Sequence, residues 1–150
     1  MAKKRKKRCG GFTLIELLIV IGIISIIAAV VIVALNPARQ FAQARNAQRW
    51  SNINTILNAT WQYAVDNKGN LPSTITTTQT EICKRGSASC TGLIDLSVLT
   101  TNEIYLVSIP EDPIGTSTDG VGYEIIRSAN GRVTVYAPDA ELGEAISATK

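Results

Sequence analysis

The sequence of 150 residues contains no histidine. Its absence removes the commonest general base and the commonest transition-metal ligand. The three cysteines do not supply the four nitrogen or sulfur ligands of a structural zinc site. The chain also lacks a GxSxG motif, a P-loop and a glycine-rich dinucleotide fingerprint. Only 18% of the residues are charged and 45% are hydrophobic, which excludes a disordered tail. The composition therefore predicts one modest domain that is not an enzyme.

The positive charge is confined to one short segment. The formal net charge is +3, but six of the 15 basic residues lie within positions 1–8. From Phe12 onward nine basic residues face 12 acidic ones, a net charge of −3. The rest of the chain is therefore mildly acidic, which argues against nucleic acid as a partner.

A long apolar run follows the basic segment. Residues 12–35 read FTLIELLIVIGIISIIAAVVIVAL, with Glu16 as the single charge. As a helix this run is ~36 Å long, against a hydrocarbon core of ~30 Å. It predicts a transmembrane helix, and the basic flank predicts a cytoplasmic N-terminus. A secretory signal peptide is the alternative, but its apolar core is shorter and ends at a small-x-small cleavage site.

Two features are unusual for a plain membrane anchor. Gly10 and Gly11 separate the basic segment from the apolar run, and glycine lets the backbone extend into a protease cleft. Glu16 lies inside the run, where an ionised carboxylate costs ~3 kcal/mol or more and usually marks a function. The alternative for Glu16 is a position near the interface, with the carboxylate reaching the headgroups.

Gly11, the following FTLIE (residues 12–16) and the apolar run resemble the N-terminus of type IV pilins and of type II secretion pseudopilins. The resemblance implies that a prepilin peptidase cuts between Gly11 and Phe12 and methylates the new amine of Phe12. It also implies an α+β fold, in which a long N-terminal helix, membrane-spanning in its first half, packs on a small C-terminal antiparallel sheet. The expected segments are a leader (1–11), a transmembrane helix (12–35), an amphipathic helix continuing from it (36–70) and a globular part (71–150).

The resemblance also implies that the subunit assembles. Glu16 can pair with the cationic amine of Phe12, on its own chain or on a neighbour, and the resemblance favours the neighbour. The implied partners are the prepilin peptidase, other copies or related pilins, an inner-membrane assembly platform and membrane lipid. Many pilins carry a proline where this chain has Val33. Here the first proline is Pro37, which should kink the chain or restart a helix.

The segment after the membrane run has helical periodicity. Five apolar residues recur at steps of three and four and predict one buried face: Trp50, Ile53, Leu57, Trp61 and Ala64. The two tryptophans could instead stack on a ligand, although core positions are more common. Three arginines follow the span, and they either form a solvated face or meet acidic surfaces of other subunits: Arg39, Arg45 and Arg49.

The cysteines predict one disulfide in the globular part. Cys9 leaves with the leader, so Cys83 and Cys90 remain in an exported domain, where cysteine pairs form disulfides. The loop between them is short, and its closure is worth ~2–3 kcal/mol.

Strand signals come late in the chain. Residues 103–109, 123–127 and 132–136 are candidate strands, and Asn130-Gly131 predicts a hairpin between the last two. Residues 74–80 read as a loop or an edge strand.

Three acidic residues in the loop before this hairpin, Glu111, Asp112 and Asp119, are weak candidates for calcium ligands. Turn chemistry explains the same residues. We therefore expect neither a cofactor nor a confident metal site.

The sequence thus predicts a prepilin-like structural subunit of a type IV pilus or a type II secretion pseudopilus. It would sit in the inner membrane as a single-pass protein and then enter a periplasmic or extracellular filament. The alternative is a monomeric, membrane-anchored extracytoplasmic binding domain, for which Glu16 and the cleavage site would have no use.

Overall fold

The computed structural model describes residues 11–115 and 118–150. The chain divides into two compact units, and the boundary lies between Gln40 and Phe41. The described part of the first unit, residues 11–40, is called the membrane unit, and residues 41–150 are called the body.

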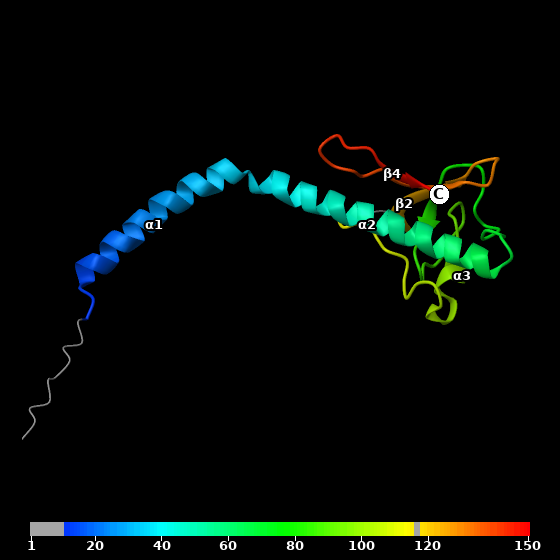
Figure 1. Ribbon diagram of the computed structural model, residues 1–150, viewed down its shortest axis with the longest axis horizontal. Coiled ribbons are helices and arrows are strands. Elements are labelled where there is room, and N and C mark those ends of the chain that lie inside the picture. Colours follow the sequence, from blue (N-terminus) through cyan, green and yellow to red (C-terminus); the bar gives the residue numbers. More distant parts are fainter. Residues whose placement is uncertain (1–10, 116–117) are drawn as a thin grey trace, which may run out of the picture. The chain divides into compact units, whose positions relative to one another are not determined.

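The membrane unit consists mainly of helix α1 (Leu14–Leu35), drawn in blue in Figure 1. At ~1.5 Å per residue its 22 residues span ~33 Å. None of them is buried, because its Leu, Ile and Val side chains point outward on every side. By length and composition α1 can cross a membrane. The fold is α+β, as expected: this apolar helix is followed by a second helix and a small antiparallel sheet.

α1 ends at Leu35, and one residue, Asn36, separates it from helix α2 (Pro37–Asp66). Asn36 adopts the left-handed conformation, with φ 42° and ψ 76°. Its carbonyl accepts the amide of Arg39 at 3.0 Å, while Pro37 has no amide to donate and fits the first turn of a helix. The helix therefore restarts at Pro37, and Val33 lies in regular helix.

α2 ends at Asp66, three residues before Gly69. Gly69 adopts φ +87°, a conformation that side chains other than glycine rarely take. Its amide donates to the carbonyl of Ala64 at 2.7 Å, which closes the last turn of the helix.

The sheet has four antiparallel strands in the order β1-β2-β3-β4. They are β1 (Thr80–Cys83), β2 (Gly120–Arg127), β3 (Val133–Ala137) and β4 (Ile146–Thr149). β2 and β3 confirm the predicted strands at 123–127 and 132–136. The hairpin between them is closed by Ser128, whose amide donates to the carbonyl of Arg132 at 2.7 Å.

The predicted strand at 103–109 was wrong. Helix α3 (Ser97–Thr100) and the short 3-10 helix η1 (Thr101–Glu103) lead into this segment. Glu103 has a φ of 57°, which is incompatible with an extended strand. Ile104 and Val107 are exposed, so the segment has no alternating buried face.

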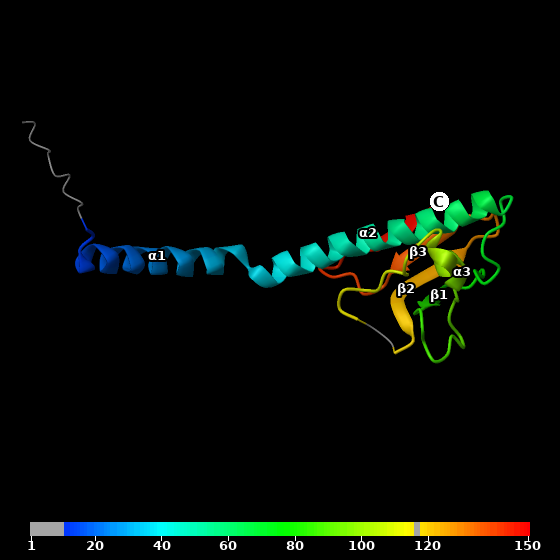
Figure 2. The same ribbon diagram turned by 90° about the horizontal axis from the view of Figure 1, so that it is seen from below.

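The core of the body lies between α2 and the sheet (Figure 2). α2 contributes Ile53, Ile56 and Leu57, and the sheet contributes Tyr123 and Ile125 from β2. β3 adds Val133 and Val135, so the two central strands bury their inward side chains against one face of the helix.

The prediction that Trp50 belongs to the buried face was wrong, since 41% of this residue is exposed. Ile53, Leu57 and Ala64 are buried as predicted, and Trp61 is partly buried. The buried face of α2 also includes Ile56. The two tryptophans therefore lie at the edge of this face and not at its centre.

Candidate functional site

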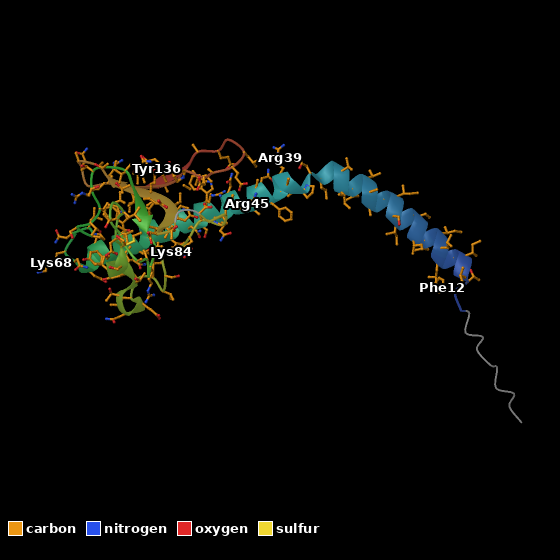
Figure 3. All side chains as sticks on the ribbon, turned by 180° about the vertical axis from the view of Figure 1, so that it is seen from behind. Phe12, Arg39, Arg45, Lys68, Lys84 and Tyr136 are labelled. Carbon is orange, nitrogen blue, oxygen red and sulfur yellow. A yellow bond between two sulfur atoms is a disulfide. The ribbon has the colours of Figure 1, made fainter. Side chains whose placement is uncertain are left out.

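Gly11 and Phe12 precede α1 in non-helical backbone. Both residues are exposed, and Phe12 is labelled in Figure 3 at the start of the helix. A Cβ built at Gly11 would meet no other atom within 4 Å. The fold of this chain therefore does not itself require glycine at position 11.

Thr13 and Glu16 form a capping box at the start of α1. The Glu16 carboxylate oxygen Oε2 accepts the amide of Thr13 at 2.8 Å and the hydroxyl of Thr13 at 2.8 Å. In return the amide of Glu16 donates to the Thr13 hydroxyl oxygen at 3.3 Å. Glu16 was predicted from the sequence as a functional residue and Thr13 was not, although the T-x-x-E spacing before an apolar run is the known signature of this cap.

The remaining hydroxyl of α1 is satisfied within the helix. Ser25 donates to the carbonyl of Ile21 at 2.7 Å, so it carries no unpaired polar atom into an apolar environment. Glu16 is the single ionisable side chain of α1.

A second polar cluster lies in the body, where Arg49 of α2 is completely buried. Its Nε and Nη2 donate to the two carboxylate oxygens of Asp112 at 2.6 and 3.0 Å. The Asp112 side chain is likewise inaccessible to solvent. This parallel pair of hydrogen bonds raises the pKa of Arg49 even though burial acts to lower it.

Glu141, in the loop between β3 and β4, joins this cluster. Its carboxylate accepts two hydrogen bonds from Arg45 at 2.6 Å and one from Arg49 at 2.9 Å. These bonds, led by those from Arg45, lower the pKa of Glu141 to about 2. The side chain of Asn46 accepts from the backbone amide of Glu141 and donates to its backbone carbonyl.

The cluster ties two loops to α2, and Figure 3 labels Arg45 on this helix. From the sequence, the three arginines were expected either to form a solvated face or to contact acidic surfaces of other subunits. Arg45 and Arg49 instead bind acidic residues of their own chain. Arg39 takes part in none of the ion pairs found among the described residues.

A disulfide joins Cys83 at the end of β1 to Cys90, as predicted, with 5.5 Å between their Cα atoms. It closes a loop that contains Lys84, which is labelled in Figure 3.

Two of the three acidic residues considered for calcium form ion pairs within the chain. Glu111 pairs with Lys84 at 2.6 Å, and Asp112 with Arg49. The backbone carbonyl of Asp119 accepts the amide of Lys84. Within residues 11–115 and 118–150, no group of three or more Cys, Asp or Glu side chains gathers to hold a metal ion.

The two tryptophans do not form a stacking pair. Trp61 lies 11 positions after Trp50 on α2, which places the two residues ~16 Å apart along the helix axis. Trp61 contributes to a surface groove of about 520 Å³ with Val65, Ile104 and Tyr105.

Comparison with known proteins identifies the N-terminal part of the chain. Residues 6–32 match the family model of the prokaryotic N-terminal methylation motif, which is the signal of type IV pilins and pseudopilins. No curated protein and no solved structure matches the chain. The matched segment contains the predicted cleavage site, the Thr13–Glu16 cap and most of α1, and none of the body.

Proposed function

We propose that this chain is a prepilin-like structural subunit, which is processed by a prepilin peptidase and assembled into a filament. The filament is a type IV pilus or a type II secretion pseudopilus. The observation that carries the proposal is the methylation motif at residues 6–32, joined directly to a helix that is long and apolar enough to cross a membrane. Proteins with this motif are structural subunits and not enzymes.

The proposed processing follows from the first 16 residues. The basic segment holds the N-terminus in the cytoplasm, so the chain crosses the inner membrane with its body outside. The peptidase cuts between Gly11 and Phe12 on the cytoplasmic side and methylates the amine of Phe12. The exposed, non-helical backbone at these two residues supports this step, because a protease binds its substrate in an extended form.

The proposed assembly follows from the exposure of α1. Lipid covers its apolar surface in the single subunit, and helices of other copies would cover it in a filament. Glu16 favours the filament, since a carboxylate in lipid is stabilised by the cationic amine of a neighbouring Phe12. An inner-membrane assembly platform would bring the copies together.

Mass spectrometry of the membrane-extracted chain tests the processing. We expect a mass that lacks residues 1–11 and carries one additional methyl group on Phe12. Gly11→Val should block the cut, because a branched side chain would enter the peptidase cleft. Gly22→Val, the same change inside α1, is the matched control and should be cut normally. A retained Met1 in cells with an active peptidase would overturn the proposal.

Comparison of sheared filaments with membrane fractions tests the assembly. Glu16→Gln preserves the size of the side chain and removes its charge, so the variant should insert at least as well as the original chain. It should nevertheless fail to enter filaments. Normal filaments would favour the monomeric anchor or purely apolar packing, and equal loss from both fractions would mean that Glu16 serves insertion.

A further inference from the structure

A groove of about 710 Å³ lies at the end of the body where α2 finishes. It is formed by α2, by the segment that follows this helix and by the hairpin between β2 and β3, and is called the hairpin groove. Trp61 is its aromatic residue, and Arg127 is the single charged residue among those that the structure describes along its walls. Neutral polar residues also line it: Asn70, Ser73, Thr77 and Ser128.

The basic side chains of the body differ in whether they have a partner. Of the eight basic residues after position 40, five are held by carboxylates or other oxygen acceptors: Arg45, Arg49, Lys84, Arg85 and Lys150. The side chains of Lys68, Arg127 and Arg132 take part in no hydrogen bond or ion pair within residues 11–115 and 118–150.

These three cations are placed around the hairpin groove. Arg127 lines it. Lys68, which Figure 3 labels just beyond α2, precedes the lining residue Gly69. Arg132 follows the lining residue Gly131. Since the described walls of the groove contain no acidic residue, this arrangement favours an anionic ligand.

The neutral residues of the groove also have hydrogen-bonding capacity to spare. The side-chain hydroxyls of Ser73 and Thr77 are on exposed residues and bond to none of the described residues. Nε1 of Trp61 is closed to solvent and is the single buried side-chain nitrogen or oxygen in the described part of the chain that has no partner. An unpaired buried donor is costly, so a small rotation of the indole toward an acceptor in the groove would be favourable.

We propose that the hairpin groove binds a carboxylated saccharide, such as a uronic acid unit of a polysaccharide. The guanidinium of Arg127 pairs with the carboxylate through two parallel hydrogen bonds. The ring hydroxyls bond to Ser73 and Thr77, and the apolar face of the sugar packs on Trp61. This binding activity goes beyond the proposed function and requires neither cleavage nor assembly.

The lining favours a saccharide over nucleic acid. Single strands bind to several stacking aromatic residues along a strongly basic track, whereas the groove has one partly buried indole and hydroxyl groups beside its cation.

The ligand class is tested on the full-length chain in a polyoxyethylene detergent, which contains no sugar. Isothermal titration calorimetry compares digalacturonate with galactobiose, which has the same rings without the carboxylates. Digalacturonate should bind at millimolar concentrations, and galactobiose about tenfold more weakly or less, the factor expected for loss of a charged hydrogen-bond partner. Equal affinities, or no binding of digalacturonate, would overturn the inference. Tighter binding of inorganic phosphate or of an oligothymidylate would also overturn it, in favour of a phosphate or a nucleic-acid site.

The site is tested by substitution. Arg127→Gln should weaken digalacturonate binding about tenfold or more. Arg85→Gln is the matched control, because Arg85 donates to the carbonyl of Val107 outside the groove. It should stay within about twofold of the original chain, since distant surface charges are screened. An unchanged affinity in Arg127→Gln would overturn the inference. If circular dichroism shows that Arg127→Gln does not fold, Thr77→Ala at an exposed loop position decides instead, with an expected loss of about threefold.

Tryptophan fluorescence locates the ligand independently. Trp50→Phe leaves Trp61 as the single tryptophan of the chain, and digalacturonate should shift its emission. Trp61→Phe leaves Trp50, which does not line the groove, and should show no shift. The reverse pattern would place the ligand elsewhere and overturn the inference.

Discussion

At position 49 the chain buries a charge where an amphipathic helix would ordinarily expose one. Arg49 is inaccessible to solvent and holds Asp112 through two hydrogen bonds. Burying both ions costs several kcal/mol of desolvation, which their mutual attraction offsets only in good geometry. The pair is therefore a specific restraint on the loop that contains Asp112, and each ion depends on the other.

Removal of one ion tests this dependence. Arg49→Met leaves Asp112 buried without a partner and should lower the free energy of unfolding of the body by ~3–5 kcal/mol. The double variant Arg49→Met, Asp112→Leu should recover much of that loss, because no buried charge remains. Urea denaturation followed by circular dichroism measures both.

The matched control for this prediction is Lys84→Met. Lys84 forms an exposed ion pair with Glu111, and such pairs are worth ~0–1 kcal/mol. Similar losses from Lys84→Met and Arg49→Met would show that burial of the Arg49 pair has no special cost.

Glu141 predicts a specific dependence of stability on pH. Its pKa is lowered from 4.5 to about 2 by hydrogen bonds from Arg45 and Arg49. A depressed pKa stabilises the fold above the unfolded-state value, and this contribution disappears as the pH falls from about 4.5 through about 2. The original chain should therefore lose more stability across this window than Glu141→Gln. Thermal unfolding at several pH values measures the difference, and parallel curves would contradict the assignment.

At the scale of elements, α1 forms from a local sequence pattern, whereas β1 depends on contacts with distant parts of the chain. α1 is specified locally, by an apolar run that contains one charge, Glu16, and ends at Leu35, before Asn36 and Pro37. β1 has only four residues and no strong pattern of its own. It is held by pairing with β2 and by the disulfide at its last residue, Cys83.

The disulfide should therefore matter for the loop after β1 and much less for the helices. Without reductant, thiol labelling of the processed chain should detect no free cysteine. The double variant Cys83→Ser, Cys90→Ser should lose ~2–3 kcal/mol of stability, the loop-closure contribution. It should keep the helical circular dichroism signal. Two reactive thiols in the original chain would refute the pairing.

At the scale of the whole molecule, the two units differ in what stabilises them. The residues of the buried apolar core all lie in the body, and α1 contributes none of them. The body therefore carries its own core, sheet and disulfide, whereas the apolar surface of α1 is exposed in the single chain. Under the proposed function, the body supplies the folded core and α1 supplies the surface for assembly.

A fragment of residues 41–150 tests this division. It should be soluble, unfold cooperatively, and match the full-length chain in detergent to within a few degrees in Tm, since no core residue is removed. It should form no filaments, because it lacks Glu16 and α1. An unfolded or aggregated fragment would show that α1 stabilises the body.

The sequence by itself determined the membrane unit. A run of 24 residues with a single charge, Glu16, after a basic segment predicts a long apolar helix, and the FTLIE motif marks its start. The β2–β3 hairpin could also be predicted from the sequence, because Asn130-Gly131 favours the turn and the flanking residues favour strands. These features depend on neighbours in the sequence and need no distant contact.

Only the tertiary structure decided the rest of the body. The burial of Arg49 depends on Asp112, 63 residues away, and Glu141 reaches Arg45 across 96 residues. No local pattern distinguishes these arginines from solvated ones, and the same holds for Trp50, which was expected in the core and is exposed. Whether a polar side chain is buried depends on a partner that tertiary contacts alone bring within reach, because burial without that partner is too costly.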